Sequence, residues 1–311
     1  MNITNLYTNT DSINQLRSNG YGAAGFDIDV APLVYTPSDL GPEQIKSSKK
    51  IVFRTDTYDE LGVHGEKYKA VPPKEMIENT RKILERSQLN LKGVTEDIQT
   101  SHKGSRTFVK YNLPEHSFMT PDGDTATLSL LAITSFDSSW PFMISVAAEQ
   151  SACLNLQVFV SGEVAVFKSK HTKGLDINHG SNIIMKSLDV FENERDLWAE
   201  WYKKPYNILE TMKLFCEVGN CKPALDFYKE NPNASPFKLM ESVKINSAVE
   251  YMWNRHMTSY TKRFGHTFWA AYNSITDWST HAGVSSRSSI GNLPSIQNQR
   301  QEKVRTILRA A

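Results

Sequence analysis

The stretch from residue 94 to residue 111, VTEDIQTSHKGSRTFVKY, decides the fold class that we expect for this chain. Its two ends, residues 94–100 and 106–111, alternate between apolar and polar side chains, which is typical of half-buried strands. Between them, His102-Lys103-Gly104-Ser105 is short, polar and contains glycine, as hairpin turns do. The stretch therefore predicts an antiparallel β-hairpin with a basic tip.

Strand-like sequence extends from this hairpin in both directions, over residues 51 to about 170. One interruption, residues 73–87, has helical spacing and begins with Pro73, a residue favoured in the first turn of a helix. The other β-prone runs are separated by glycine, proline and serine, and they predict a sheet built from hairpins. These further predicted strands are residues 51–53, 67–71, 125–135, 142–148 and 158–168.

After residue 180 the apolar residues recur at the helical period. One apolar stripe ends at Pro205 and a second at Gly219-Asn220, while Ser235-Pro236 is a favourable start for a third helix. A fourth stripe runs from residue 268 to residue 279. Strands followed by helices predict an α+β fold, with a β-hairpin-rich antiparallel sheet backed by helices and a helical C-terminal part.

By composition the chain divides into four parts. Residues 1–50 hold many glycines and prolines and predict an irregular N-terminal arm. Residues 51–180 are the β-rich core, and residues 181–283 are the helical part packed on that core. Residues 284–311 are first rich in serine, asparagine and glutamine and then basic, which predicts a loose basic C-terminal tail with a short helix at its end.

The overall composition is that of an ordinary globular protein. Of 311 residues, 40% are hydrophobic, and 35 basic residues balance 34 acidic ones, so disorder is not expected. No apolar run reaches the roughly 18 residues of a membrane span, and the first residues do not resemble a secretory signal. Three cysteines are too few for a disulfide framework. The sequence therefore predicts a cytoplasmic protein without a membrane partner.

Motifs for covalent chemistry are weak throughout the chain. The glycines of residues 20–25, GYGAAG, have dinucleotide spacing, but polar residues precede them and no helix is predicted after them. The phosphate-binding P-loop pattern is missing, and Cys216 and Cys221 have no second pair at zinc spacing. The sequence therefore predicts no catalytic residue, no metal and no cofactor.

The positive signal is a group of basic residues on the predicted hairpin. Strand alternation puts Arg106, Phe108 and Lys110 on one face, close to Lys103 in the turn and Tyr111 at the end of the run. Cations in this arrangement can hold phosphates, and aromatic rings can stack on bases. The alternative is a solvated charged face, with Phe108 and Tyr111 packed in the core of the sheet.

Other basic clusters fall in the same β-rich part. Acidic residues concentrate elsewhere, for example after residue 190. Such a separation of charge suits nucleic-acid binding on one surface, and it equally suits self-association. The further candidate contacts are Lys168, Lys170 and Lys173 in one cluster, Lys67 and Lys69 in another, and Arg54 upstream of both.

Four segments resemble the motifs of a phage- and plasmid-encoded family that is catalogued as a domain of unknown function. Residues 65–71, GEKYKAV, look like its G-x-x-Y-x-x-V hairpin, and residues 104–108, GSRTF, look like its G-x-R strand with an aromatic residue. Cys153-Leu154-Asn155, with Lys170-His171-Thr172 downstream, resembles its C-x-N and K-H-T pairing. Residues 273–278, NSITDW, resemble its N-A-x-T-E-[FY] helix, with serine in place of alanine.

This family is remotely similar to proteins that anneal single-stranded DNA, of the Rad type and the phage RecT/Redβ type. The resemblance implies ATP-independent annealing in phage homologous recombination, by a ring or filament of subunits in the infected bacterial cytoplasm. The implied partners are single-stranded DNA, the annealed duplex intermediate and further copies of the chain, with a phage exonuclease or a host single-strand-binding protein as additional candidates. The resemblance also implies a structural role for His171, near Asn155.

Two other functions are weighed against annealing. One is a phage structural or protein-interaction protein without annealing activity, whose basic residues serve solubility. Salt-sensitive binding of a single-stranded oligonucleotide separates it from an annealing protein. The other is a metal-dependent nuclease, which loss of DNA integrity in magnesium or manganese would support. Its candidate carboxylates are Asp27, Asp29, Asp122 and Asp124.

Overall fold

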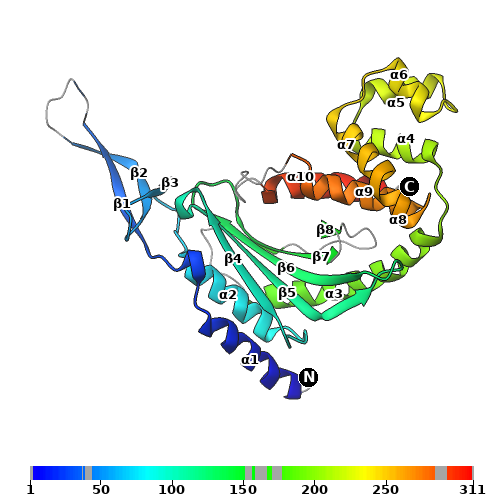
Figure 1. Cartoon of the computed structure of the whole chain (residues 1–311). Coiled ribbons are helices and arrows are strands. Elements are labelled where there is room, and N and C mark those ends of the chain that lie inside the picture. Colours follow the sequence, from blue (N-terminus) through cyan, green and yellow to red (C-terminus); the bar gives the residue numbers. More distant parts are fainter. Residues whose placement is uncertain are drawn as a thin grey trace.

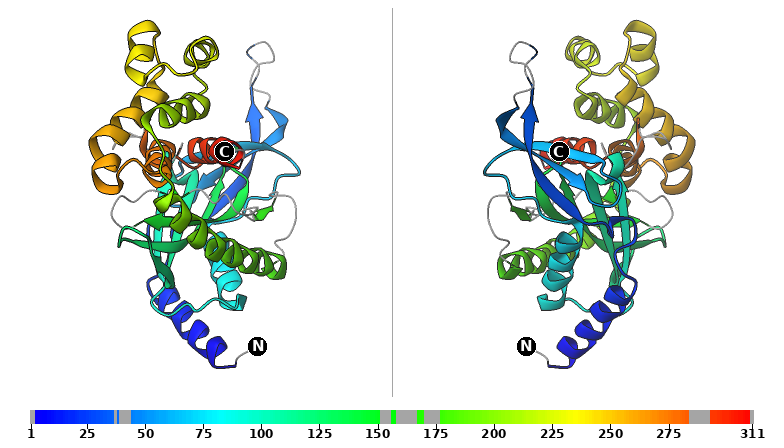
Figure 2. Two further views of the ribbon diagram at one scale, coloured as in Figure 1. Left: turned by 90° about the vertical axis from the view of Figure 1, so that its right-hand side faces the viewer. Right: turned by 90° about the vertical axis from the view of Figure 1, so that its left-hand side faces the viewer.

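Two antiparallel sheets organise the N-terminal half of the chain, and helices make up most of its C-terminal part (Figures 1 and 2). This arrangement, seen in a computed structural model, confirms the predicted α+β class. The structure describes residues 3–36, 38, 44–150, 156–157, 167–169, 177–283 and 293–309.

The smaller sheet, called the arm sheet below, projects away from the rest of the protein, which we call the body (Figure 1). Its strands β1, β2 and β3 lie in that order and pair antiparallel. β2 is the central strand, so β1 and β3 are the two edges. The strands are β1 Ile28–Tyr35, β2 Ile45–Arg54 and β3 Glu60–Gly65.

A small apolar cluster attaches the arm sheet to the body. Phe26, Val52 and Leu61 are buried together with Phe136, which follows the last residue of a body strand. β3 passes very close to this phenylalanine, because a Cβ atom at Gly62 would lie 1.9 Å from the Phe136 carbonyl oxygen. Only glycine fits at this crossing.

The larger sheet, called the main sheet, contains the predicted basic hairpin. In its order β4-β5-β6-β7-β8, each strand is antiparallel to the next, and β9 pairs with β7 as well. The register of β4 and β5 joins Ser101 to Arg106 and Thr95 to Asn112, as a tight hairpin requires. The strands are β4 Thr95–Ser101, β5 Arg106–Met119, β6 Thr125–Ser135, β7 Phe142–Gln150, β8 Leu156–Gln157 and β9 Phe167–Ser169.

One face of the main sheet forms the core with two helices. Along β5, Val109, Tyr111 and Leu113 are all 0% exposed, whereas the residues between them are half-buried. α2, Pro73–Arg86, begins with proline at its first position as predicted and buries one apolar side. α2 and α3, Ile177–Lys203, lie beneath the main sheet in Figure 1.

The C-terminal part is a packed group of helices. The predicted third helix is two helices, because the chain leaves helical conformation at Val243 and starts again after the cap Asn246. A five-residue π-helical segment, His256–Tyr260, joins two of the others. The helices are α4 Ile208–Gly219, α5 Lys222–Glu230, α6 Pro236–Ser242, α7 Ser247–Arg255, α8 Thr261–Phe264, α9 Phe268–His281 and α10 Leu293–Leu308. In the part of the chain that the structure describes, none of the helices combines the length and the apolar character of a membrane span.

The N-terminal prediction of an irregular arm is wrong for most of residues 1–50. α1, Ile3–Ser18, is a helix, and β1 pairs antiparallel with β2, with a register shift between Pro32 and Val34. α1 was missed because its apolar residues are sparse, with Ile13 and Leu16 buried against the body. The glycines of residues 20–25 form a short 3-10 turn that links α1 to the arm sheet.

Two further predictions need correction. Residues 67–71 are not a strand, because β3 ends at Gly65 and the chain turns before α2. The described part of the C-terminal tail is not loose, since Val304 and Leu308 are buried in the core. Arg300 of the same helix donates to the Trp278 carbonyl at 2.9 Å. Arg300, Lys303 and Arg305 of the tail therefore belong to a packed helix.

Candidate nucleic-acid interface

The predicted basic hairpin has the expected backbone but a different electrostatic character. β5 directs Arg106, Phe108 and Lys110 away from the buried face, as strand alternation predicts. Both cations, however, lie against carboxylates from distant positions. Arg106 Nε is 2.5 Å from Asp137 Oδ2, and Lys110 Nζ is 2.8 Å from Glu149 Oε2. These side chains are neutralised inside the main sheet rather than presented as free charge.

The same holds for the turn of the hairpin. Lys103 Nζ lies 2.7 Å from Asp59 Oδ1, in the turn between β2 and β3. The hydrogen bond between Lys103 and Asp59 lowers the pKa of the Asp59 carboxyl and raises the pKa of the Lys103 ammonium group. Arg54 binds Asp56 in the same turn at 2.6 Å and donates to the Lys103 carbonyl oxygen at 3.3 Å. Two of the predicted phosphate contacts therefore hold the arm sheet and the basic hairpin together.

The two predicted stacking residues lie on opposite faces of β5. Tyr111 is 0% exposed and belongs to the core between the main sheet and the helices. Phe108 is half-buried and packs with Ile133, Trp140 and Met143. In this conformation the Tyr111 ring is inaccessible to a nucleic-acid base, and the Phe108 ring is only partly accessible.

The lysine cluster after β7 is only partly described. Lys168 is in β9, where its backbone pairs with Met143. Lys170, His171, Lys173 and Asn155 lie outside the described residues.

Unpaired basic side chains gather on and beside the arm sheet. Lys67 and Lys69 are exposed in the segment between β3 and α2. β2 adds Lys46 and Lys49, which are exposed, and Lys50, which is half-buried. Among the residues that the structure describes, no carboxylate forms an ion pair with any of these five lysines. Sequence reasoning missed Lys46 and counted Lys49 and Lys50 only as added charge upstream of the basic clusters, because residues 45–50 were not predicted to be a strand.

The arm sheet also carries most of the large hydrophobic side chains that are exposed in the described residues. The large hydrophobic side chains that stand exposed on it are Val30, Val34, Tyr35, Tyr58 and Val63, against Met119 and Phe237 elsewhere in the described residues. One titratable residue beside this surface, His64, has a shifted pKa. Burial, with the nearby charge of Lys50, lowers the pKa of His64, whose Nε2–H donates to the Phe136 carbonyl. The arm sheet thus combines free cations with exposed apolar side chains.

The carboxylates considered for a nuclease do not form one group. Asp27 pairs with Lys74 at 2.9 Å, at the base of the arm sheet. Asp122 pairs with Arg263 of α8 at 2.7 Å, at the opposite end of β5 from the basic hairpin. Across the described ranges, no three histidine, cysteine, aspartate or glutamate side chains come close enough together to hold a metal ion.

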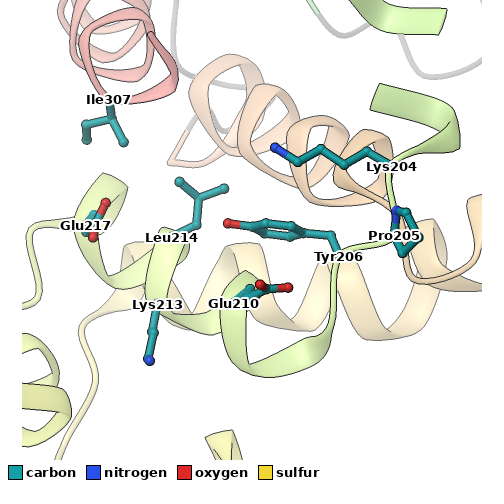
Figure 3. A pocket seen from close by; sticks show the side chains of 8 residues that line it. All are labelled: Lys204, Pro205, Tyr206, Glu210, Lys213, Leu214, Glu217 and Ile307. Carbon is teal, nitrogen blue, oxygen red and sulfur yellow. The ribbon is translucent and has the colours of Figure 1, made fainter. Parts of the chain in front are cut away.

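A surface cavity of about 460 Å³ lies beside α4 and is also lined by residues 204–206 and by α10 (Figure 3). Two of its charged groups, Glu210 and Lys213, already have structural partners. Glu210 closes the capping box of α4 with Asn207, and Lys213 donates to the Pro232 carbonyl at 2.6 Å. Burial raises the pKa of Tyr206 to about 12. We assign no ligand to this cavity, which is lined by Lys204, Pro205, Tyr206, Glu210, Lys213, Leu214, Glu217 and Ile307.

The C-terminal motif of residues 273–278 lies in the buried helix α9. Asp277, which is 1% exposed, accepts hydrogen bonds from the hydroxyls of Tyr251 and Tyr260, both at 2.7 Å. Arg255 Nε donates to the same carboxylate at 2.6 Å. The π-helical segment ends at Tyr260 and brings its hydroxyl to the carboxylate. The acidic residue of the motif therefore joins α7, α9 and the π-helical segment.

Comparison with protein families identifies one match. The model of a domain of unknown function, DUF932, matches residues 60–309, most of the chain. The chain belongs to this family. No curated protein and no solved structure matches it. The DUF932 match begins at β3 and includes the main sheet and the helical part, so β1 and β2 of the arm sheet precede it. It confirms the resemblance to a domain of unknown function, while the similarity to annealing proteins remains a prediction.

Proposed function

We propose that this DUF932 protein binds single-stranded DNA and anneals complementary strands without ATP. The observation that carries the proposal is the group of unpaired lysines on and beside the arm sheet. Phosphates are held by such cations with little dependence on base sequence, which suits a protein that must accept any pair of complementary strands. The expected resemblance to annealing proteins supports the same function.

The proposed contacts differ from those that the sequence favoured. Lys49, Lys67 and Lys69 take the place of Lys103, Arg106 and Lys110, because the latter three already have carboxylate partners within 2.8 Å. A phosphate at Lys110 would have to displace Glu149, whereas a phosphate at Lys49 displaces only water and counterions. Lys103 and Arg54 serve the site indirectly by fixing the β2–β3 turn.

The proposed mechanism is physical and involves no covalent step. A strand bound by its phosphates loses much of its repulsion for a second strand, because the lysines neutralise part of its charge. Its bases stay free to test pairing, and matched pairs supply the free energy of annealing. One arm sheet contacts a short length of DNA, so we propose that several subunits act together as a homo-oligomer.

The test is an annealing assay with two complementary labelled oligonucleotides, without ATP, at low and high salt. Annealing faster than the protein-free control, and slowed by salt, is the expected result. The logarithm of affinity for either strand should fall with the logarithm of salt, with a slope of about 0.7 for each phosphate neutralised. Absence of both acceleration and strand binding at low salt would overturn the proposal.

A second candidate function is a protein-interaction module without annealing activity. The exposed apolar side chains of the arm sheet favour it, since monomeric soluble proteins rarely group such residues on one projecting element. Light scattering of the protein alone, with and without an oligonucleotide, separates the two functions. Salt-dependent DNA binding supports the first proposal, whereas a stable oligomer that ignores DNA supports the second.

A further inference from the structure

The turn between β2 and β3 presents an aromatic residue to solvent in an unusual backbone conformation. Tyr58 is 78% exposed and has a φ angle of 60°, in the left-handed region that bulky residues rarely adopt. Such conformations persist only where the surrounding structure enforces them, and they concentrate at functional sites. An exposed tyrosine contributes nothing to the core that would compensate for this strain.

The turn is held in place from both of its sides. Asp56 forms an ion pair with Arg54 at 2.6 Å, and Asp59 forms one with Lys103 of the basic hairpin at 2.7 Å. Thr57 Oγ1 donates to Asp59 Oδ2 at 2.9 Å, and the Tyr58 backbone N–H donates to the Arg54 carbonyl at 3.1 Å. These contacts fix the backbone of the turn, and with it the position from which the Tyr58 side chain projects, before any ligand arrives.

The ring of Tyr58 continues a strip of apolar side chains along the arm sheet. It stacks on Phe53 with ring centroids 6.3 Å apart and an angle of 20° between the ring planes. Phe53 shares its face of β2 with Ile51 and, across the pairing to β3, with Val63. The opposite face holds Val52 and packs on the body. The strip therefore faces away from the body.

Free cations lie at the far end of this strip. Lys49 is on the same face of β2 as Phe53, four residues earlier, which corresponds to about 13 Å along a strand. Its pairing partner is Gly65, and Lys67 follows two residues later in the next turn. Four carboxylates lie at the aromatic end: Asp29 and Glu60 pair with Phe53, and Asp56 and Asp59 of the turn form ion pairs with Arg54 and Lys103. Positive charge at one end and a stacking surface at the other fit a chain of phosphates with protruding bases.

We infer that Tyr58 is a stacking platform for an unpaired base of single-stranded nucleic acid whose phosphates are held by Lys49 and Lys67. This inference rests on the proposed function and adds the residue that receives a base. Lys103 and Arg54 then act as positioning residues. This role explains why they form ion pairs with the β2–β3 turn instead of contacting phosphates.

The experiment compares two ligands, a labelled thymidine oligonucleotide and an abasic oligomer of the same length. Tyr58→Asn is the main variant, because asparagine tolerates a positive φ and removes only the ring. We expect it to bind the thymidine oligonucleotide about 5- to 150-fold more weakly, the range that corresponds to the stacking energy of one base on an aromatic ring. Its affinity for the abasic oligomer and its salt slope should equal those of the wild type.

Two further variants serve as controls. Tyr58→Phe should bind both ligands like the wild type, because it keeps the ring. Phe237→Ala should do the same, since Phe237 is an exposed aromatic residue, 55% exposed, that lies on α6 and not on the arm sheet. Equal melting temperatures of the wild type and Tyr58→Asn show that the turn is retained.

The outcomes distinguish this inference from the function on which it rests. If Tyr58→Asn binds the thymidine oligonucleotide like the wild type, Tyr58 is not a stacking residue, although the protein still binds DNA. If the variant loses affinity for both ligands equally, the turn contributes shape rather than stacking, and the inference is again wrong. If the wild type binds neither ligand at low salt, the proposed function fails as well.

Discussion

The main sheet and the arm sheet differ in how they use their basic side chains, although Arg54 at the end of β2 is paired with Asp56. In the main sheet Arg106 and Lys110 meet carboxylates that lie 31 and 39 residues away along the chain. In the arm sheet Lys46 and Lys49 remain exposed without such partners among the described residues. The comparison teaches that clusters of basic residues in a sequence do not measure free positive charge, because folding brings distant acids to some of them.

The largest effect should come from breaking the charge network of the body. Arg81 is completely buried, lies 2.6 Å from Glu96 and 2.7 Å from Glu78, and donates to the Gly20 carbonyl. Arg81→Ala leaves Glu96 buried without its partner, so we expect a loss of about 3–5 kcal/mol in the free energy of unfolding. Urea denaturation measures this loss, and Lys49→Ala on the arm sheet should change stability by less than about 0.5 kcal/mol. Equal effects of the two variants would contradict the comparison.

A second prediction concerns the dependence of stability on pH. Burial lowers the pKa of His256 to about 4, whereas the unfolded imidazole titrates near 6.5. The unfolded chain therefore binds the proton first as pH falls. Stability from this group is complete above pH 6.5 and decreases between pH 6.5 and pH 4, by at most about 1.4 kcal/mol per pH unit.

The matched variant for this prediction is His256→Asn. The pKa values of His64 and His116 are also lowered, chiefly by burial, so these groups add to the decrease in the same direction. Only the difference between wild type and variant isolates His256. Denaturation midpoints measured at several pH values give this difference, and identical slopes in the two proteins would show that His256 is not protected by the fold.

The third prediction tests the arm sheet directly. Lys49→Glu combined with Lys67→Glu should weaken binding of a single-stranded oligonucleotide at least tenfold, because two phosphate contacts become repulsive. Fluorescence anisotropy at several salt concentrations should also show the salt slope reduced by about 1.4, the contribution of two phosphates. The melting temperature should stay unchanged, since both lysines are exposed. Normal binding by this variant would remove the arm sheet from the proposed interface.

The smallest effect is expected for the ion pair of the main sheet. Lys110 and Glu149 are both partly exposed, at 22% and 17% of their side chains, and solvent screens their interaction. A double-mutant cycle with Lys110→Gln and Glu149→Gln should give a coupling of at most about 1 kcal/mol. Oligonucleotide affinity of Lys110→Gln should equal that of the wild type. A strong loss of affinity would return Lys110 to the interface and reverse the comparison.

The sequence was sufficient for the parts of the fold that depend on local pattern. Alternation located the hairpin of β4 and β5, and Pro73 located the start of α2. It was insufficient where long-range packing decides, as in α1, whose few apolar residues are buried by contacts with distant parts of the chain.

The candidate site was less predictable than the fold. Sequence reasoning identified Lys67 and Lys69 but placed them on a strand, and it favoured Lys103, whose partner Asp59 lies 44 residues away. Nothing local distinguishes a lysine that will meet an acid from one that will not. Tyr58 carries no local signal either. Its exposure and its positive φ angle depend on contacts between the β2–β3 turn and the turn of the basic hairpin, which lie far apart in the sequence.

The amide of Asn9 has a consequence for the order in which the protein folds. It donates to the Leu89 carbonyl at 2.8 Å and accepts from the Leu91 backbone N–H at 3.0 Å. The side chain thus makes the two hydrogen bonds that the backbone of a neighbouring strand would make. The hairpins of the main sheet close over short loops, whereas this contact spans about 80 residues and must wait for α2. We therefore expect α1 to dock late, and in hydrogen exchange its amides should open before those of β5 and β6.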